Sequence, residues 1–212
     1  MNKEISFRNL SRAAWHDFSQ ERFSWILLAA GNLGIVILTY FCKTYSMPLV
    51  AILLNLLSII YSVMLSKKAL NLVYGKESNI FQVTPSFFIA LLWNVALVLA
   101  VSSYSRKLIL IQDNSSFNVI NVILYAIASY FIVRFVFVDL VLLEEESKIS
   151  DAFRKSFQIT QHRFFLLVGI YSYFSLVLFL SLMTVVGYLF VFPYVMIMRV
   201  LLFKHVSENL KS

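Results

Sequence analysis

The sequence is poor in the residues from which catalytic and metal sites are most often built. Its 212 residues include a single cysteine, Cys42, and only three histidines, His16, His162 and His205. One cysteine excludes an intramolecular disulfide and any Cys-x-x-Cys pair, so neither redox chemistry nor a zinc site has support. The histidines are scattered, with no His-x-x-x-His spacing. The sequence therefore predicts no metal, no cofactor and no catalytic residue.

Charged residues are also scarce, at 14% of the chain, whereas hydrophobic residues make up 60%. The hydrophobic residues collect in long runs, and a helix needs roughly 20 apolar residues to cross a hydrocarbon layer about 30 Å thick. Runs such as 50–57, which are apolar apart from Asn55, show no alternation of polar and apolar residues, which disfavours the strands of an outer-membrane barrel. The pattern thus predicts an all-α, polytopic membrane protein.

The longest apolar run covers 164–203 and carries no charge before Arg199. As one helix its 40 residues would reach roughly 60 Å, which is twice the thickness of the hydrocarbon layer. The run must therefore fold back, and we expect a turn within 182–187. The weak breaks in this region are Ser181, Thr184 and Gly187. Together the runs predict one membrane domain over 1–212 with six spans, at 23–41, 47–65, 87–104, 119–143, 164–182 and 188–203.

The basic residues predict the orientation of these spans. Short cytoplasmic loops retain Lys and Arg, whereas translocated loops lack them. Of the 18 Lys and Arg residues, 14 lie before the first span, in the second and fourth gaps and at the C-terminal end. The opposite gaps hold only Lys43, Arg106 and Lys107, and Arg134 lies within a span. Both termini are therefore expected in the cytoplasm, and the first span is expected to stay attached rather than to be cleaved as a signal peptide.

A short motif recurs ahead of the spans. Residues 81–84 read Phe-Gln-Val-Thr and residues 157–160 read Phe-Gln-Ile-Thr, each shortly before a Phe-Phe pair, and a weaker third copy covers 19–23. The three copies can reflect a true triplication of the sequence, or they can be chance matches in a chain of biased composition. Both interpretations stay open. We interpret the chain as three helical hairpins, each introduced by a cytoplasmic segment. The middle segment differs, because 67–74 are expected to continue the second span and to end at Gly75.

Two of the introductory segments, 5–20 and 148–161, are amphipathic at helical spacing. In the segment 5–20, the apolar residues that share one face of the helix are Phe7, Leu10, Ala14 and Phe18. In the second segment the corresponding face is Ile149, Ala152, Phe153, Ser156 and Phe157, opposite Asp151, Arg154, Lys155 and Gln158. Such helices lie in the interface plane with the apolar side among the acyl chains. We expect them to act as elbows that orient the hairpins. The alternative is a docking surface for a cytoplasmic partner, carried by Arg154 and Lys155.

The stretch from Asp139 through the Asp-Ala-Phe-Arg-Lys-Ser of 151–156, and on to Pro193-Tyr194, resembles the C-terminal half of a group of bacterial membrane proteins. The group includes the YciC-like family and the membrane domain attached to some glycerophosphodiester phosphodiesterases. In these families an Ala-x-x-x-Ser cytoplasmic helix precedes a span, and a Pro-Tyr pair lies in the last span. The resemblance covers 119–206 and extends to the N-terminal half through architecture alone. It implies a six-helix inner-membrane protein and carries over no catalytic residue. The 212 residues include no soluble phosphodiesterase domain, so hydrolysis is not expected.

Polar side chains at membrane depth are the candidate functional residues, because each must find a partner or leave the hydrocarbon. Asn32, Asn55 and Asn94 fall near the centres of the first three spans, and Arg134 and Asp139 lie in the fourth. We expect the asparagines either to hydrogen-bond between helices or to line a shared polar cavity. Arg134 either extends to the headgroups or binds an anion between helices. Asp139 lies about 140° around the helix from Arg134, so the two are expected to serve different neighbours.

These features predict a non-enzymatic protein of the bacterial inner membrane that acts in lipid or envelope homeostasis as an accessory component. The alternative is a permease or transporter subunit, coupled to a cytoplasmic partner through the helix 148–161. Against it, permease coupling loops usually carry a glycine, and none lies between Lys148 and Val168. The net charge of +7 lies mostly beside the membrane, where each basic residue favours anionic headgroups by about 1 kcal/mol. Membrane lipids are therefore the expected partners, and nucleic acid is not.

Overall fold

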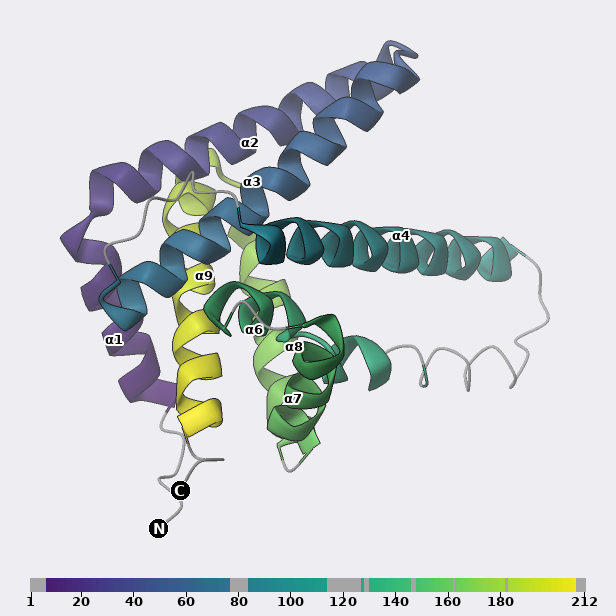
Figure 1. The fold of residues 1–212 in the computed structure, drawn as a ribbon. Coiled ribbons are helices and arrows are strands. Elements are labelled where there is room, and N and C mark those ends of the chain that lie inside the picture. The colour runs from purple at the N-terminus through teal and green to yellow at the C-terminus, as the bar shows by residue number, and fades with distance from the viewer. Residues whose placement is uncertain are drawn as a thin grey trace. The chain divides into compact units, whose positions relative to one another are not determined.

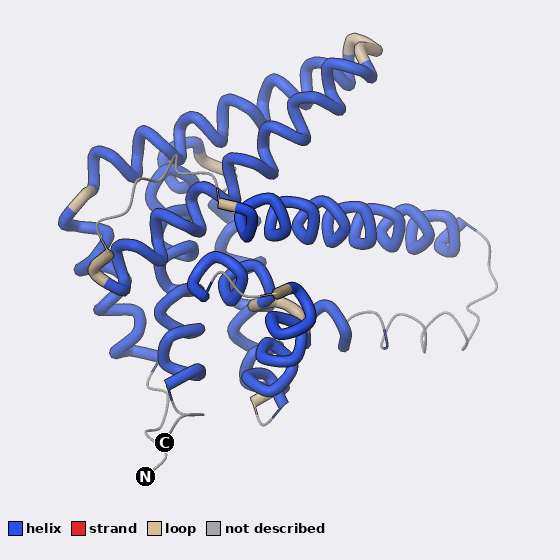
Figure 2. The backbone as a smooth tube through the Cα atoms, in the orientation of Figure 1, coloured by secondary structure: helices blue, strands red, loops and turns tan. Residues whose placement is uncertain are grey.

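The protein is all-α over the residues that the computed structural model describes, which are 7–76, 84–113, 127, 130–145, 148–161, 163–181 and 183–208 (Figure 1, Figure 2). Side chains are described for the same residues except 100–113. No strand occurs in these ranges, which confirms that the fold is all-α. The helices are α1 (Phe7–Gln20), α2 (Arg22–Thr44), α3 (Pro48–Tyr74), α4 (Pro85–Asp113), α6 (Val138–Glu145), α7 (Ile149–Gln161), α8 (Phe164–Ser181) and α9 (Val185–Glu208).

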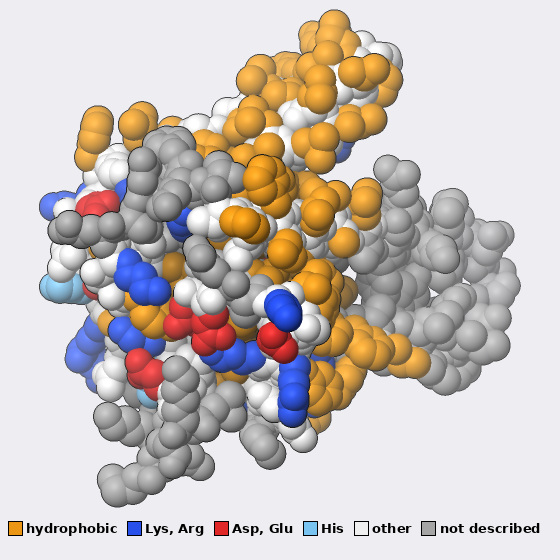
Figure 3. All heavy atoms as spheres, in the orientation of Figure 1, with side chains coloured by type: hydrophobic (Ala, Val, Ile, Leu, Met, Phe, Trp, Pro, Cys, Tyr) orange, Lys and Arg blue, Asp and Glu red, His pale blue; other side chains and the backbone are white. Residues whose placement is uncertain are grey.

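Four of the described helices, α2, α3, α8 and α9, are long and apolar enough to cross a membrane. They cover the runs expected to span at 23–41, 47–65, 164–182 and 188–203. Large apolar side chains are exposed along these helices, and Figure 3 shows them over the outer half of α2 and α3. A water-soluble protein rarely exposes so much contiguous apolar surface. The helices are therefore compatible with a multi-pass membrane protein.

The remaining two expected spans are described only in part. α4 is apolar from Pro85 to Leu99 and continues as a helix to Asp113. Most of 119–143 lies outside the described residues, as do 81–83 of the first copy of the recurring motif. Within 130–145 the chain does not form one continuous helix, because a turn at 135–137 separates a short helical stretch from α6. The expectation of an uninterrupted helix is wrong at this point.

The structure divides into two compact units, and each is described by itself. Unit 1 comprises Met1–Thr84 and Val168–Ser212, and unit 2 comprises Pro85–Leu167. The single membrane domain over 1–212 stays a prediction. In unit 1, α2 and α3 pack along each other as an antiparallel hairpin, and α9 packs against both. In unit 2, α6 packs against α4 and α7.

Local signals explain where the helices of unit 1 end. α3 ends at Gly75, which has the left-handed φ of 62° that glycine adopts without strain. The amides of Gly75 and Lys76 donate to the carbonyls of Leu72 and Asn71, as in a Schellman motif. This confirms the helix end predicted at Gly75.

The chain turns at residues 183–184, inside the predicted range, and Thr184 provides the cap that starts α9. The backbone amide of Gly187 donates to Thr184 Oγ1 at 3.2 Å, which satisfies one of the free amides of the first turn. A side chain at 187 would collide with that hydroxyl and approach the Ser181 carbonyl to 3.3 Å. Glycine is therefore required for the cap to form.

The apolar face of α1 meets protein rather than acyl chains. Ala14 and Phe18 are fully buried, α1 packs along α9, and the ring of Phe18 lies 6.1 Å from that of Phe190. Tyr194 Oη also donates to Ser11 Oγ at 2.8 Å. The expectation that this face lies among lipids is corrected for Ala14 and Phe18. The reason is that a helix with a suitable partner buries its apolar stripe against that partner.

Candidate functional site

The turn at 135–137 in unit 2 frees a backbone carbonyl, and α7 captures it. In a continuous helix the amide of Val138 would bond the carbonyl of Arg134, but it bonds that of Phe135 instead, at 3.2 Å. Ser156 Oγ donates to the Arg134 carbonyl at 2.9 Å, and Thr160 Oγ1 lies 3.4 Å from the same oxygen. The break in one helix is thus compensated by hydroxyls of another, as buried backbone groups require.

The face of α7 that makes this contact differs from the predicted one. Ala152 and Ser156 are fully buried as expected, whereas Ile149 and Phe157 are exposed. Ile159 and Thr160 are buried instead, so the contact face is rotated toward them. The Ala-x-x-x-Ser pair lies on this face, where the small alanine allows a close approach and the serine supplies the hydroxyl.

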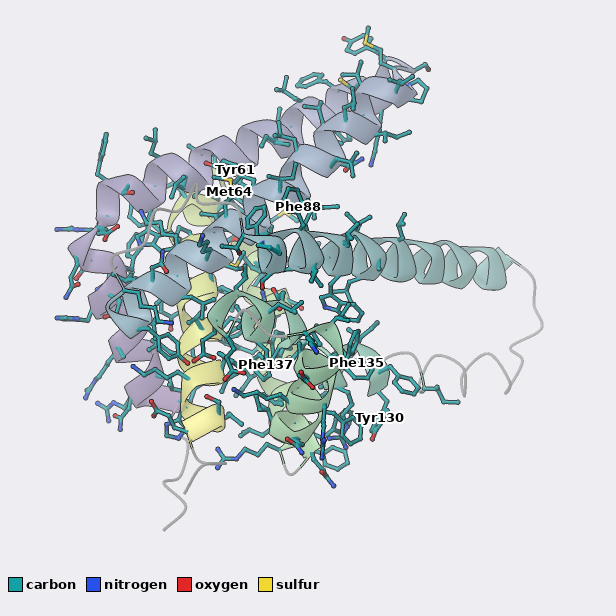
Figure 4. The ribbon with its side chains drawn as sticks, in the orientation of Figure 1. Tyr61, Met64, Phe88, Tyr130, Phe135 and Phe137 are labelled. Carbon is teal, nitrogen blue, oxygen red and sulfur yellow. The ribbon has the colours of Figure 1, made fainter. Side chains whose placement is uncertain are left out.

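An aromatic cluster holds the turn in place. The ring of Phe135, labelled in Figure 4, lies 5.0 Å from that of Phe153 on α7 and 6.2 Å from that of Trp93 on α4. The rings of Trp93 and Phe153 are themselves 4.8 Å apart and edge to face. Such pairs stabilise packing by about 0.5–1.5 kcal/mol beyond the area they bury. The cluster thus packs the first residue of the turn against both α4 and α7.

The side chain of Arg134 is enclosed by three aromatic rings of unit 2. The guanidinium carbon lies 4.8 Å from the ring centre of Tyr130, 4.8 Å from that of Phe157 and 5.3 Å from that of Phe164. Arg134 is only 7% exposed. Each cation–π contact of this kind stabilises by about 0.5–2 kcal/mol, more as the cation loses its water.

The rings leave the hydrogen-bonding capacity of Arg134 unused. Nε and Nη1 are buried and have no hydrogen-bond partner in the part of the chain that the structure describes. Together these two nitrogens carry three N–H donors. A buried donor without a partner costs about 1–3 kcal/mol, and more when it is charged. The arrangement therefore suits a charged acceptor that the described residues do not provide.

Asp139 is buried in the first turn of α6. Glu145, at the end of the same helix, is occupied, because Lys155 Nζ forms an ion pair with its Oε1. Arg154 is exposed on α7, whereas Lys155 is held by this ion pair.

The three asparagines make different contacts. Asn32 is buried in unit 1, and its Oδ1 accepts a hydrogen bond from Tyr188 Oη at 2.8 Å, which joins α2 to α9. Asn55 and Asn94 instead donate to the carbonyls four residues earlier in their own helices, each at 2.8 Å. Only Asn32 thus makes the predicted interhelical bond. Asn32 and Asn55 belong to unit 1 and Asn94 to unit 2.

A buried lysine in unit 1 was not predicted as a site residue. Lys68 Nζ forms an ion pair with Glu21 Oε2 at 3.0 Å, donates to Ser24 Oγ and lies 4.9 Å from the ring centre of Trp25. These contacts tie the end of α3 to the α1–α2 junction. The sequence signal was the basic character of 67–68, which indicates orientation but gives no sign of a partner 47 positions away.

No group of three or more His, Cys, Asp or Glu side chains within the described ranges is placed to hold a metal ion. Comparison of the chain with protein-family models, with curated proteins and with solved structures gave no match.

Proposed function

We propose that this chain is a non-enzymatic, multi-pass protein of the bacterial inner membrane that binds an anionic lipid headgroup at Arg134. Its role would be that of an accessory component in lipid or envelope homeostasis. The observation that carries the proposal is the buried guanidinium of Arg134, whose Nε and Nη1 have no partner in the described chain. The apolar helices α2, α3, α8 and α9 support the location.

Phosphate is the acceptor that best suits this arrangement. Its oxygens accept several hydrogen bonds and carry the opposite charge, and hydrogen bonds between charged groups are roughly twice as strong as neutral ones. The aromatic rings exclude water and lower the local dielectric, which strengthens the attraction. A phospholipid is the most abundant source of phosphate at the membrane surface. Phe157, which is 37% exposed, covers one side of the guanidinium and would move aside as the headgroup enters.

The proposed topology has six spans with both termini in the cytoplasm, as the basic residues predict. Contacts within unit 1 support the placement of several basic segments on the same side of the membrane. Lys204, near the end of α9, donates to the Val73 carbonyl at the end of α3, at 3.1 Å, and Lys68 pairs with Glu21. The resemblance to the YciC-like family, carried by Ala152 and Ser156 among others, is in line with this architecture.

The single cysteine provides a test of the topology. Cys42 is partly exposed near the turn between α2 and α3, which the proposal places on the periplasmic side. A membrane-impermeant maleimide should label Cys42 in intact spheroplasts, and Cys42→Ser should abolish the labelling. Labelling that occurs only after the membrane is permeabilised would show that the orientation is reversed.

Lipid binding is tested by native mass spectrometry of the purified protein with added phosphatidylglycerol. The wild type should retain the lipid, and Arg134→Leu should lose it. Arg154→Leu is the matched control, because it removes the same charge from an exposed position and should bind as the wild type does. Equal retention by all three proteins would refute the headgroup site. Equal loss in both variants would indicate attraction by net charge alone.

A permease or transporter subunit is the second candidate function. It is favoured by the exposed side of α7, where Asp151 and Arg154 face outward and could contact a cytoplasmic motor. Lys155 is less suited to this role, since Glu145 already holds it. If this function is correct, an ATPase should co-purify in mild detergent, and Arg154→Glu should release it while leaving lipid retention unchanged.

A further inference from the structure

The outer half of the α2–α3 hairpin exposes an amide at the depth where hydrocarbon is expected. Asn55 lies midway along the apolar part of α3 and is exposed. Ile52 and Leu56 beside it are exposed too, at 59% and 41%. The only hydrogen bond that Asn55 makes among the described residues runs to the Ala51 carbonyl of its own helix. Its Oδ1 and its second N–H therefore lack a partner in the described part of the chain, and lipid tails offer none.

The exposed amide lies on a face of α3 that is buried further along the helix. At 100° per residue, Ile52, Asn55 and Ile59 fall within about 60° of one another, and Ser66 and Leu70 fall on the same face. Ser66 and Leu70 are buried, whereas Ile52 and Asn55 are not. A face that packs against protein at one end thus continues, uncovered, to the other.

We propose that this face of α3 forms an interface within the membrane between two copies of this chain, with Asn55 of each copy hydrogen-bonded to the other. An asparagine side chain has both donors and an acceptor, so it is complementary to itself. A two-fold axis brings identical residues together, which is the geometry that such a pair needs. Polar side chains and close packing associate transmembrane helices because apolar contact with lipid gives no preference of its own.

This inference requires α3 to cross the membrane, but it does not depend on the lipid site at Arg134. Two features of the hairpin favour a second copy over lipid alone. Lipid would leave the amide unsatisfied, whereas the opposing Asn55 satisfies it. The exposed side chains of Ile52 and Leu56 flank the amide and supply apolar contact around the bond.

Self-association is measured by energy transfer between labelled copies of the purified protein in liposomes, over a range of protein-to-lipid ratios. Asn55→Leu should weaken association about 3- to 30-fold, which corresponds to the usual strength of hydrogen bonds between membrane helices. Asn94→Leu is the matched control, because Asn94 makes the same bond within its own helix at the same 2.8 Å. It should associate as the wild type does. A wild type that stays monomeric at all ratios, or an Asn55→Leu variant that associates normally, would overturn the proposal.

Disulfide cross-linking tests which face of α3 lies at the proposed interface between the two copies. In a Cys42→Ser background, Ile52→Cys or Ile59→Cys should cross-link two copies, whereas Leu53→Cys or Leu57→Cys, on the other side of the helix, should not. Equal cross-linking of both pairs would exclude the proposed face. Alkaline extraction of the liposomes separates the possible failures. Release of the wild type would refute the membrane location itself, whereas retention without association would refute only the dimer and leave the lipid site untouched.

Discussion

Ser156→Ala tests the idea that α7 compensates for the helix break. Ser156 is fully buried, and its hydroxyl donates to the freed Arg134 carbonyl at 2.9 Å. The loss of such a donor costs about 1–3 kcal/mol in soluble proteins and about 0.6 kcal/mol on average between membrane helices. Thr160 lies 3.4 Å from the same oxygen and can replace part of the bond. We therefore expect the free energy of unfolding to fall by about 0.6–2 kcal/mol.

The measurement is unfolding of the protein in mild detergent, followed by circular dichroism as SDS is added. Ser150→Ala is the control, because Ser150 lies on the same helix but is exposed. Its effect should stay within about 0.5 kcal/mol. The double variant Ser156→Ala/Thr160→Val should cost more than the sum of its parts, since it leaves the carbonyl with no donor. If Ser156→Ala unfolds like Ser150→Ala, or if the two effects add, the hydroxyls do not share the carbonyl as described.

Further substitutions test contacts in unit 1. Tyr188→Phe leaves the buried Asn32 Oδ1 without its donor and should lower the unfolding free energy by about 0.6–2 kcal/mol, whereas Tyr173→Phe, at an exposed position, should not. Equal effects would show that the hydroxyl of Tyr188 contributes nothing. Gly187→Ala should displace the hydroxyl that caps α9 and cost about 0.5–2 kcal/mol. Gly169→Ala, where a new methyl group meets no atom within 4 Å, should be neutral or slightly stabilising. A Gly187→Ala variant as stable as Gly169→Ala would remove the argument for the cap.

The parts of the fold that could be predicted depend on strong local signals. The lengths of the apolar runs follow from the thickness of the bilayer, so the long apolar helices were foreseeable. Gly75 ends α3 because few other residues adopt a left-handed conformation without strain. Thr184 and Gly187 together specify the turn before α9. Each of these features is decided by residues close together in the sequence.

The features that could not be predicted depend on distant partners. The run 119–143 is predominantly apolar, and hydropathy cannot distinguish one continuous helix from two helices joined by a turn. The turn at 135–137 packs Phe135 against Trp93 and Phe153, which are remote in sequence. The enclosure of Arg134 was missed for the same reason, although its position inside an apolar run correctly marked it as a candidate. The sequence shows that a charged side chain at this depth costs free energy, but it does not show which rings surround Arg134.

The packing of α1 along α9 has a consequence for how the protein is made. Figure 1 shows the two helices side by side, although they are the first and last of the described helices. A ribosome completes α1 long before α9 emerges. Phe18 therefore has no contact with Phe190 until the intervening segments have been inserted. During that interval the apolar face of the newly made α1 is exposed. We expect this face to bind the membrane surface or a chaperone. Assembly of unit 1 can therefore finish only after α9 has been translated.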